Sequence, residues 1–139
     1  MTDKIPQLQQ STIDGIELFP KQEYHISLVS LDKICVGKAQ KRKLFAALTE
    51  FFRNNLGTVS LTSIDKCRYL CHKGGKDTLI AMANIRGLQE MWAVVTQFIP
   101  NAPPPFPHVT LLMSKEAERG IGLHSKDDLL RYCREVHNM

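Results

Sequence analysis

The sequence contains no apolar stretch that approaches the roughly 20 residues of a membrane-spanning helix. Its first ten residues are polar and lack the basic-then-apolar layout of a secretory signal peptide. We therefore expect a cytoplasmic protein that does not associate with a membrane. The formal net charge of +4 is lower than expected for a protein dedicated to coating nucleic acid, although it is compatible with an anionic ligand.

Cysteine is scarce, and the four cysteines do not follow the paired spacing of a zinc site. Cys67, Cys71 and His72 would not share one face of a strand, so a metal site that combines them with His124 is not expected. On one strand, Cys67 and Cys71 would lie roughly 13 Å apart, which is too far for a disulfide. We expect four reduced thiols and no bound metal.

Apolar residues make up 43% of the chain and charged residues 23%, so the chain can bury a core. Its 139 residues fit a single domain over residues 1–139, with residues 1–10 as a loose arm. We expect this domain to be a monomer.

Hydrophobic spacing predicts an α+β fold in which strands and two amphipathic helices alternate. The Gly74-Gly75-Lys76 segment lacks the rest of a phosphate-binding loop motif and is predicted to be a hairpin turn. The expected elements are strands over 13–20 and 24–30, a helix over 38–56, strands over 58–63, 66–72 and 78–83, a helix over 88–98, a strand over 109–113, a short strand over 120–123 and a helix that begins after Ser125.

Two tetrapeptides share one pattern, histidine–apolar–hydroxyl–leucine, at residues 25–28 (HISL) and 108–111 (HVTL). In an extended strand, successive side chains point to opposite faces. The histidine and the hydroxyl residue of each copy therefore share one face, while the apolar residues anchor the other face in a core. Each copy is expected in one half of the chain, with one helix per half, as in an approximate internal repeat.

The paired motifs suit chemistry on a phosphate. Histidine titrates near neutral pH, so of His25 and His108 one can start neutral as a base and the other protonated as an acid. Ser27 and Thr110 are placed to donate hydrogen bonds to the same phosphate, and the arrangement requires no metal. The alternative is that both are ordinary strand histidines with similar neighbours.

Together with Phe106-Pro107, which precedes the second copy, the motifs resemble those of the two-histidine (2H) phosphoesterase superfamily. That superfamily includes RNA 2′,3′-cyclic phosphodiesterases and bacterial RNA 2′-5′ ligase-like proteins, and the resemblance covers about residues 13–123. It implies a bilobal, pseudo-symmetric α+β fold with antiparallel sheets, a helix per lobe and a central cleft. Many relatives carry an arginine at the position that Met113 occupies here.

By this resemblance, His25 and His108 match the catalytic histidines, and Ser27 and Thr110 match the phosphate-binding hydroxyls. The expected activity is metal-independent hydrolysis of a ribose 2′,3′-cyclic phosphate on an RNA end or a nucleotide, or 2′-5′ RNA ligation when a ribose hydroxyl takes the place of water. The near symmetry of the motifs leaves the roles of the two histidines unassigned. Further candidates for substrate contacts are Tyr69, Lys73, Arg86 and Lys115.

Two other functions compete with this one. The first is a nucleotide- or RNA-binding module of the same fold that keeps the pocket without turning over a substrate. The second is an interaction domain in which the basic helix around Lys41-Arg42-Lys43 faces a protein partner. Intact histidines and hydroxyls in both motifs favour the enzyme over the binding module.

Overall fold

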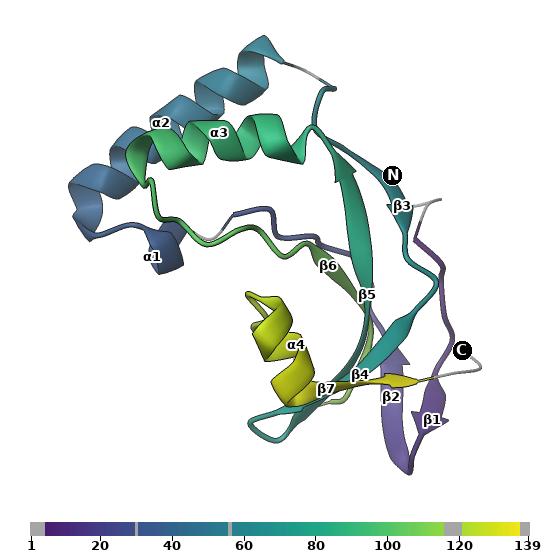
Figure 1. Ribbon diagram of the computed structural model, residues 1–139. Coiled ribbons are helices and arrows are strands. Elements are labelled where there is room, and N and C mark those ends of the chain that lie inside the picture. Colours follow the sequence, from purple (N-terminus) through teal and green to yellow (C-terminus); the bar gives the residue numbers. More distant parts are fainter. Residues whose placement is uncertain (1–4, 30, 56, 116–120, 137–139) are drawn as a thin grey trace.

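The computed structural model describes residues 5–29, 31–55, 57–115 and 121–136. It has an α+β fold with a curled antiparallel sheet (Figure 1). In chain order the elements are β1 (Ser11–Ile13), β2 (Ile16–Pro20), α1 (Leu31–Ile34), α2 (Gly37–Asn54), β3 (Ser60–Ile64), β4 (Arg68–Lys73), β5 (Lys76–Arg86), α3 (Leu88–Phe98), β6 (His108–Met113), α4 (Lys126–Tyr132) and β7 (Cys133–Val136). Within these residues the sheet order is β1-β2-β6-β5-β4-β7, and β3 pairs with β5.

Both faces of the central strand β5 are buried, because its side chains alternate between two cores. Leu79 and Ala81 point into the cores that β5 shares with β2, β3 and β6. Ile80 points to the opposite face, where Leu129 of α4 covers the sheet. Ile5 is also buried, in the core around Ala81, and Leu8 packs against the same core, whereas Gln7, Gln9 and Gln10 are exposed.

The two long helices form a unit with its own hydrophobic core. Leu44 and Leu48 of α2 pack against Met91 and Val95 of α3, and all four side chains are buried. Figure 1 shows α2 and α3 side by side at one end of the sheet. The expected division into two pseudo-symmetric lobes with one helix each is therefore not confirmed, because both helices belong to one layer.

Several predicted elements agree with the structure. The helix expected over 88–98 is α3, and Ser125 caps α4, since its hydroxyl accepts a hydrogen bond from the Asp128 N–H. The region 24–29 differs, because it forms only an isolated bridge at Ile26 instead of a strand. Residues 121–123 form no strand, and position 120 lies outside the described residues.

The expectation of four reduced thiols is wrong for two of them, since Cys71 and Cys133 form a disulfide. β7, which the sequence did not predict, pairs antiparallel with β4 and places Cys133 directly opposite Cys71. Their Cα atoms are 4.0 Å apart. Cys35 and Cys67 remain free thiols. No helix in the described parts of the chain has the length and apolar character to cross a membrane.

Gly87, between β5 and α3, is expected to tolerate no side chain. Its φ is +81°, and a Cβ there would overlap the main-chain carbonyl of Thr58. We expect Gly87→Ala to lower the free energy of unfolding by about 1–3 kcal/mol, because both the backbone strain and the overlap must be relieved. Chemical denaturation would measure this loss.

Gly57→Ala is the matched control, because Gly57 has a φ of +78° with no atom within 4 Å of the added Cβ. It carries the backbone strain alone. Equal losses in the two variants would show that the contact with Thr58 contributes nothing.

Candidate functional site

The two motifs lie side by side in the fold. Ile26 and Val109 form an antiparallel bridge, and both side chains pack into the core around Ala81. In an antiparallel pair, the residues one position before and one position after a bridged pair also lie opposite each other. This register sets His25 opposite Thr110 and Ser27 opposite His108, so that each imidazole faces the hydroxyl residue of the other motif.

A looped-out segment of the chain accompanies this pairing. β2 pairs with β6 through Pro20 and Leu112, and the chain returns to β6 at Ile26, opposite Val109. Five residues, 21–25, lie between Pro20 and Ile26, whereas only two lie between their partners. Because of this excess, the segment 21–25 cannot run alongside β6 residue by residue. Three of its residues, Lys21, Gln22 and Glu23, line the cavity described next.

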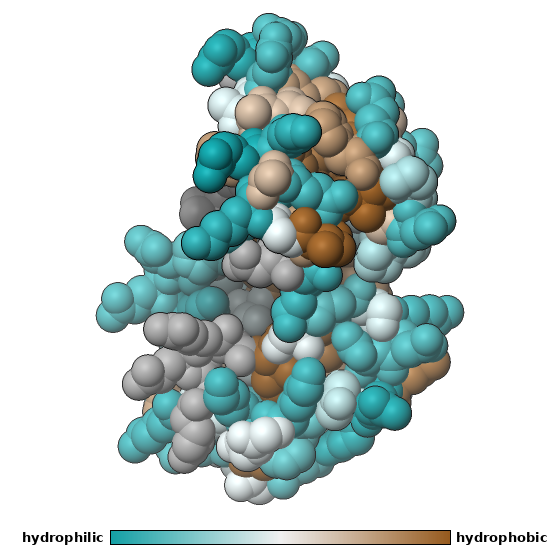
Figure 2. Space-filling view, turned by 90° about the vertical axis from the view of Figure 1, so that its left-hand side faces the viewer, coloured by the Kyte–Doolittle hydropathy of each residue, from teal (hydrophilic) through white to brown (hydrophobic). Residues whose placement is uncertain are grey.

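A cavity of about 610 Å³ brings the four motif residues together. It is bounded by α1 and Trp92 of α3 on one side and by the sheet and the segment before α4 on the other. Figure 2 looks onto the left-hand side of Figure 1, where α1 lies, and shows a recess between the upper and lower parts of the molecule. The lining includes His25, Ser27, His108, Thr110, Lys33, Trp92, Phe106 and His124.

His108 is the more enclosed of the two motif histidines. Burial lowers its pKa below the ordinary histidine value, against a smaller opposing effect of the Phe106 carbonyl. That carbonyl lies 3.0 Å from His108 Nδ1, so Nδ1 carries the hydrogen and donates it. In the neutral ring, Nε2 is therefore the unprotonated nitrogen that can accept a proton. This is the state that a general base needs.

His25 stands at the open rim of the cavity. Its side chain is 70% exposed, and its Nε2 atom lies 3.7 Å from a carboxylate oxygen of Glu23. The Glu23 side chain is itself 82% exposed, so solvent screens this pair strongly. His25 and His108 thus occupy different environments although their sequence motifs are nearly identical.

The further residues considered for substrate contact do not line this cavity. Tyr69 packs under Leu129 and the segment before α4, and burial raises its pKa. Lys73 lies over the Tyr132 ring, and Lys115 lies over the Phe19 ring. Arg86 lines a separate depression at the start of α3. These contacts could not be predicted from the sequence, because they depend on the order of the strands in the sheet.

The structure adds three basic residues to the site that the sequence did not single out for it. Lys21, Lys33 and His124 belong to the looped-out segment, to α1 and to the segment before α4. A charged residue beside a proline or at a helix end gave no signal of function. Trp92 packs in the helical core and also reaches the cavity.

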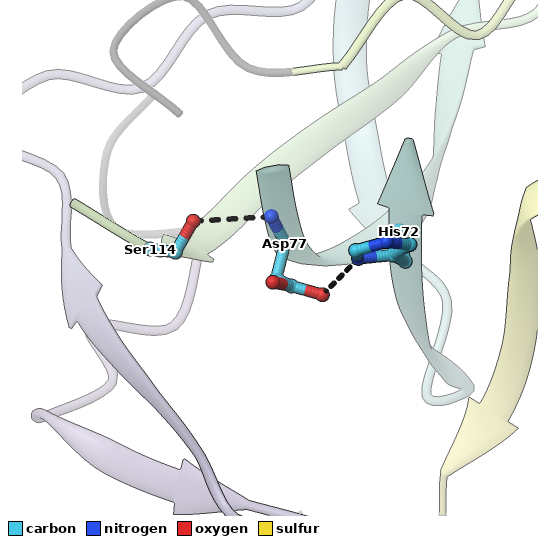
Figure 3. A network of polar contacts seen from close by, with 3 residues as sticks. All are labelled: His72, Asp77 and Ser114. Atoms are coloured by element: carbon cyan, nitrogen blue, oxygen red, sulfur yellow. Dashed lines mark hydrogen bonds and ion pairs between the residues drawn. The ribbon is translucent and has the colours of Figure 1, made fainter. Parts of the chain in front are cut away.

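A second polar cluster joins the β4–β5 hairpin to the end of β6 (Figure 3). His72 Nδ1 lies 2.8 Å from Asp77 Oδ1, and the Asp77 main-chain N–H donates to the Ser114 hydroxyl. The Ser114 hydroxyl therefore contacts the backbone of Asp77 and not the imidazole. This is not the arrangement of a nucleophilic serine with its base, and the cluster secures the hairpin.

Among the described residues, no group of three or more His, Cys, Asp or Glu side chains is arranged to hold a metal ion. Comparisons of the chain with protein-family models, with curated proteins and with solved structures found no match.

Proposed function

We propose that this protein is a metal-independent phosphodiesterase that hydrolyses a ribose 2′,3′-cyclic phosphate, on an RNA end or a nucleotide, by acid/base catalysis between two histidines. One observation carries the proposal. The antiparallel bridge between Ile26 and Val109 places both motifs on one cavity wall, where His25, Ser27, His108 and Thr110 all line the same space. A phosphate there can meet two imidazoles and two hydroxyl donors.

In this mechanism His108 is the base, because its enclosed ring favours the neutral form and its Nε2 atom is free to accept a proton. It takes a proton from water, and the water oxygen bonds to phosphorus. The bond from phosphorus to one ribose oxygen breaks, and His25 protonates that oxygen. Ser27 and Thr110 stabilise the charge that develops on the phosphoryl oxygens.

The resemblance of the motifs to those of 2H phosphoesterases supports the same function. It adds two finer proposals, a bilobal pseudo-symmetric arrangement and a ligation reaction, in which a ribose hydroxyl replaces water as the nucleophile, opens the cyclic phosphate and forms a 2′-5′ linkage. Met113 occupies the position where many relatives carry an arginine. It lies on β6, opposite Phe19 of β2 and Thr78 of β5.

The competing function is a binding module for nucleotides or RNA that uses the same cavity without chemistry. Incubation with 2′,3′-cyclic AMP, in EDTA, separates the two. The enzyme is expected to yield adenosine 2′- or 3′-monophosphate with undiminished rate as EDTA is raised. Binding of the cyclic nucleotide without any product would favour the module, and activity that EDTA abolishes would contradict the metal-independent mechanism.

The pH dependence of hydrolysis is expected to report the lowered pKa of His108. Its neutral form is the active one, so kcat/KM falls as the pH drops through this pKa. Burial lowers the pKa, and the acidic limb should therefore have its midpoint below about 6.5, the ordinary value for histidine. Rates measured between pH 4.5 and 9 at low substrate concentration would give this midpoint. A midpoint above the ordinary value would show that His108 is not the base.

A further inference from the structure

His124 brings a third imidazole to the cavity that contains His25 and His108. It comes from a different part of the chain, directly before α4, and belongs to neither motif. The rings of His124 and His108 are close enough to interact, since a charge on His124 adds to the effect of burial in lowering the pKa of His108. In the proposed mechanism His108 and His25 both move protons, and His124 has no assigned task.

The segment that carries His124 is firmly held. The side chains of Ile121 and Leu123 are buried, 9% and 4% exposed, in the core beneath α4. The His124 N–H donates to Asp128 Oδ2 at 2.9 Å, and Ser125 caps the same helix. Main-chain and core contacts thus fix the position of residue 124, while its side chain stays exposed.

The ring of His124 lies over Gly122, which also lines the cavity. A Cβ added at Gly122 would come within 3.3 Å of His124 Nε2, closer than side-chain carbons normally approach. The absence of a side chain at Gly122 therefore leaves room for the imidazole in this orientation. The Lys73 ammonium contacts the Gly122 carbonyl at 3.4 Å on the same segment.

We propose that His124 binds the substrate phosphate. Its ring N–H donates a hydrogen bond to a phosphate oxygen whose bond to phosphorus is neither formed nor broken in the reaction. This inference rests on the proposed function, because it assumes that the other two imidazoles are engaged in proton transfer. A neutral imidazole can donate one such hydrogen bond, and an imidazolium adds a full positive charge. His124 is then a substrate-binding residue, and because an imidazolium in general binds an anion more strongly than a neutral imidazole, its role is tested on both sides of neutral pH.

Other charged or titratable groups line the same space, namely Lys21, Glu23, His25, Lys33 and His108. Asp128 contacts the main chain of His124. The test must therefore separate His124 from the two motif histidines, which replacement of His124 alone achieves.

The experiment measures the affinity for adenosine 2′-monophosphate by calorimetry at pH 6 and pH 8. His124→Ala is expected to weaken binding roughly 10-fold at pH 6 and less at pH 8, as for a lost hydrogen bond to a charged group. His124→Lys should restore the affinity at both pH values. Gly122→Ala should weaken binding with the imidazole retained, because the ring must move. His72→Ala, outside the cavity, is the control and should bind as the wild type does.

The outcomes distinguish the two proposals. If the wild type hydrolyses 2′,3′-cyclic AMP and His124→Ala binds the monophosphate unchanged at both pH values, the role of His124 is refuted and the proposed function stands. If the wild type neither hydrolyses the cyclic nucleotide nor binds the monophosphate, the proposed function fails and the inference fails with it. Equal weakening at both pH values in every variant, His124→Lys included, would indicate a structural effect and also refute the role.

Discussion

Replacement of His108 by alanine is expected to lower kcat for 2′,3′-cyclic AMP by about 10²-fold or more. The ring is half-buried, its Nδ1 atom is committed to the Phe106 carbonyl, and its Nε2 atom is the free acceptor in the cavity. No other group on β6 can take its place, since Thr110 carries a hydroxyl with no useful basicity near neutral pH. His25→Ala should cause a loss of the same order, because it removes the proposed acid. Steady-state rates in EDTA would measure both losses.

The double variant is the sharper measurement. Two groups that act in one step give non-additive losses. We expect His25→Ala combined with His108→Ala to be about as slow as the slower single variant. His72→Ala is the matched control, since His72 lies at the β4–β5 hairpin and contacts Asp77. If both single variants keep full activity, the proposed mechanism is wrong.

Loss of the Cys71–Cys133 disulfide is expected to have the largest effect on stability. The two cysteines are 62 residues apart in sequence, and the bond restricts the unfolded chain over that span. The chain-entropy model gives about 4 kcal/mol for such a loop, within a usual range of about 2–5 kcal/mol. The replacement of both cysteines by alanine should lower the free energy of unfolding by that amount. Urea denaturation of the wild type and the variant would measure it.

Replacement of the two free cysteines, Cys35 and Cys67, is the control for this experiment. Cys67 is exposed, so its replacement should change little. Peptide mapping without reductant should also find Cys71 linked to Cys133. The disulfide joins β4 to the strand that directly follows α4, so its loss is also expected to loosen the segment that carries His124. An unchanged denaturation midpoint under strong reductant would contradict the stabilising role of this bond.

The parts of the fold that could be predicted are those fixed by local pattern. The 3.6-residue spacing of Leu88, Met91 and Val95 defines α3, and Ser125 shows the hydrogen bond of a helix N-cap. The alternation around each motif was sufficient to place the histidine and the hydroxyl residue on one face. The bridge between Ile26 and Val109 then places both motif faces on one cavity.

The parts that could not be predicted depend on contacts between distant segments. Cys71 and Cys133 are adjacent only because β7 pairs with β4, and a four-residue strand after a helix has no distinctive pattern. His124 enters the cavity because the buried side chains of Ile121 and Leu123 hold its segment there. The packing of α2 against α3 could not be predicted from either helix alone, because each has one apolar face that could equally have covered a sheet.

The central claim is that the two motifs act together on one phosphate. The most direct test is a crystal structure of the protein with adenosine 2′-monophosphate bound. We expect phosphate oxygens within hydrogen-bond distance, about 2.7–3.2 Å, of both His25 and His108 and of the hydroxyls of Ser27 and Thr110. A phosphate bound elsewhere, such as along the basic residues of α2, with both motif imidazoles free of it, would contradict the account.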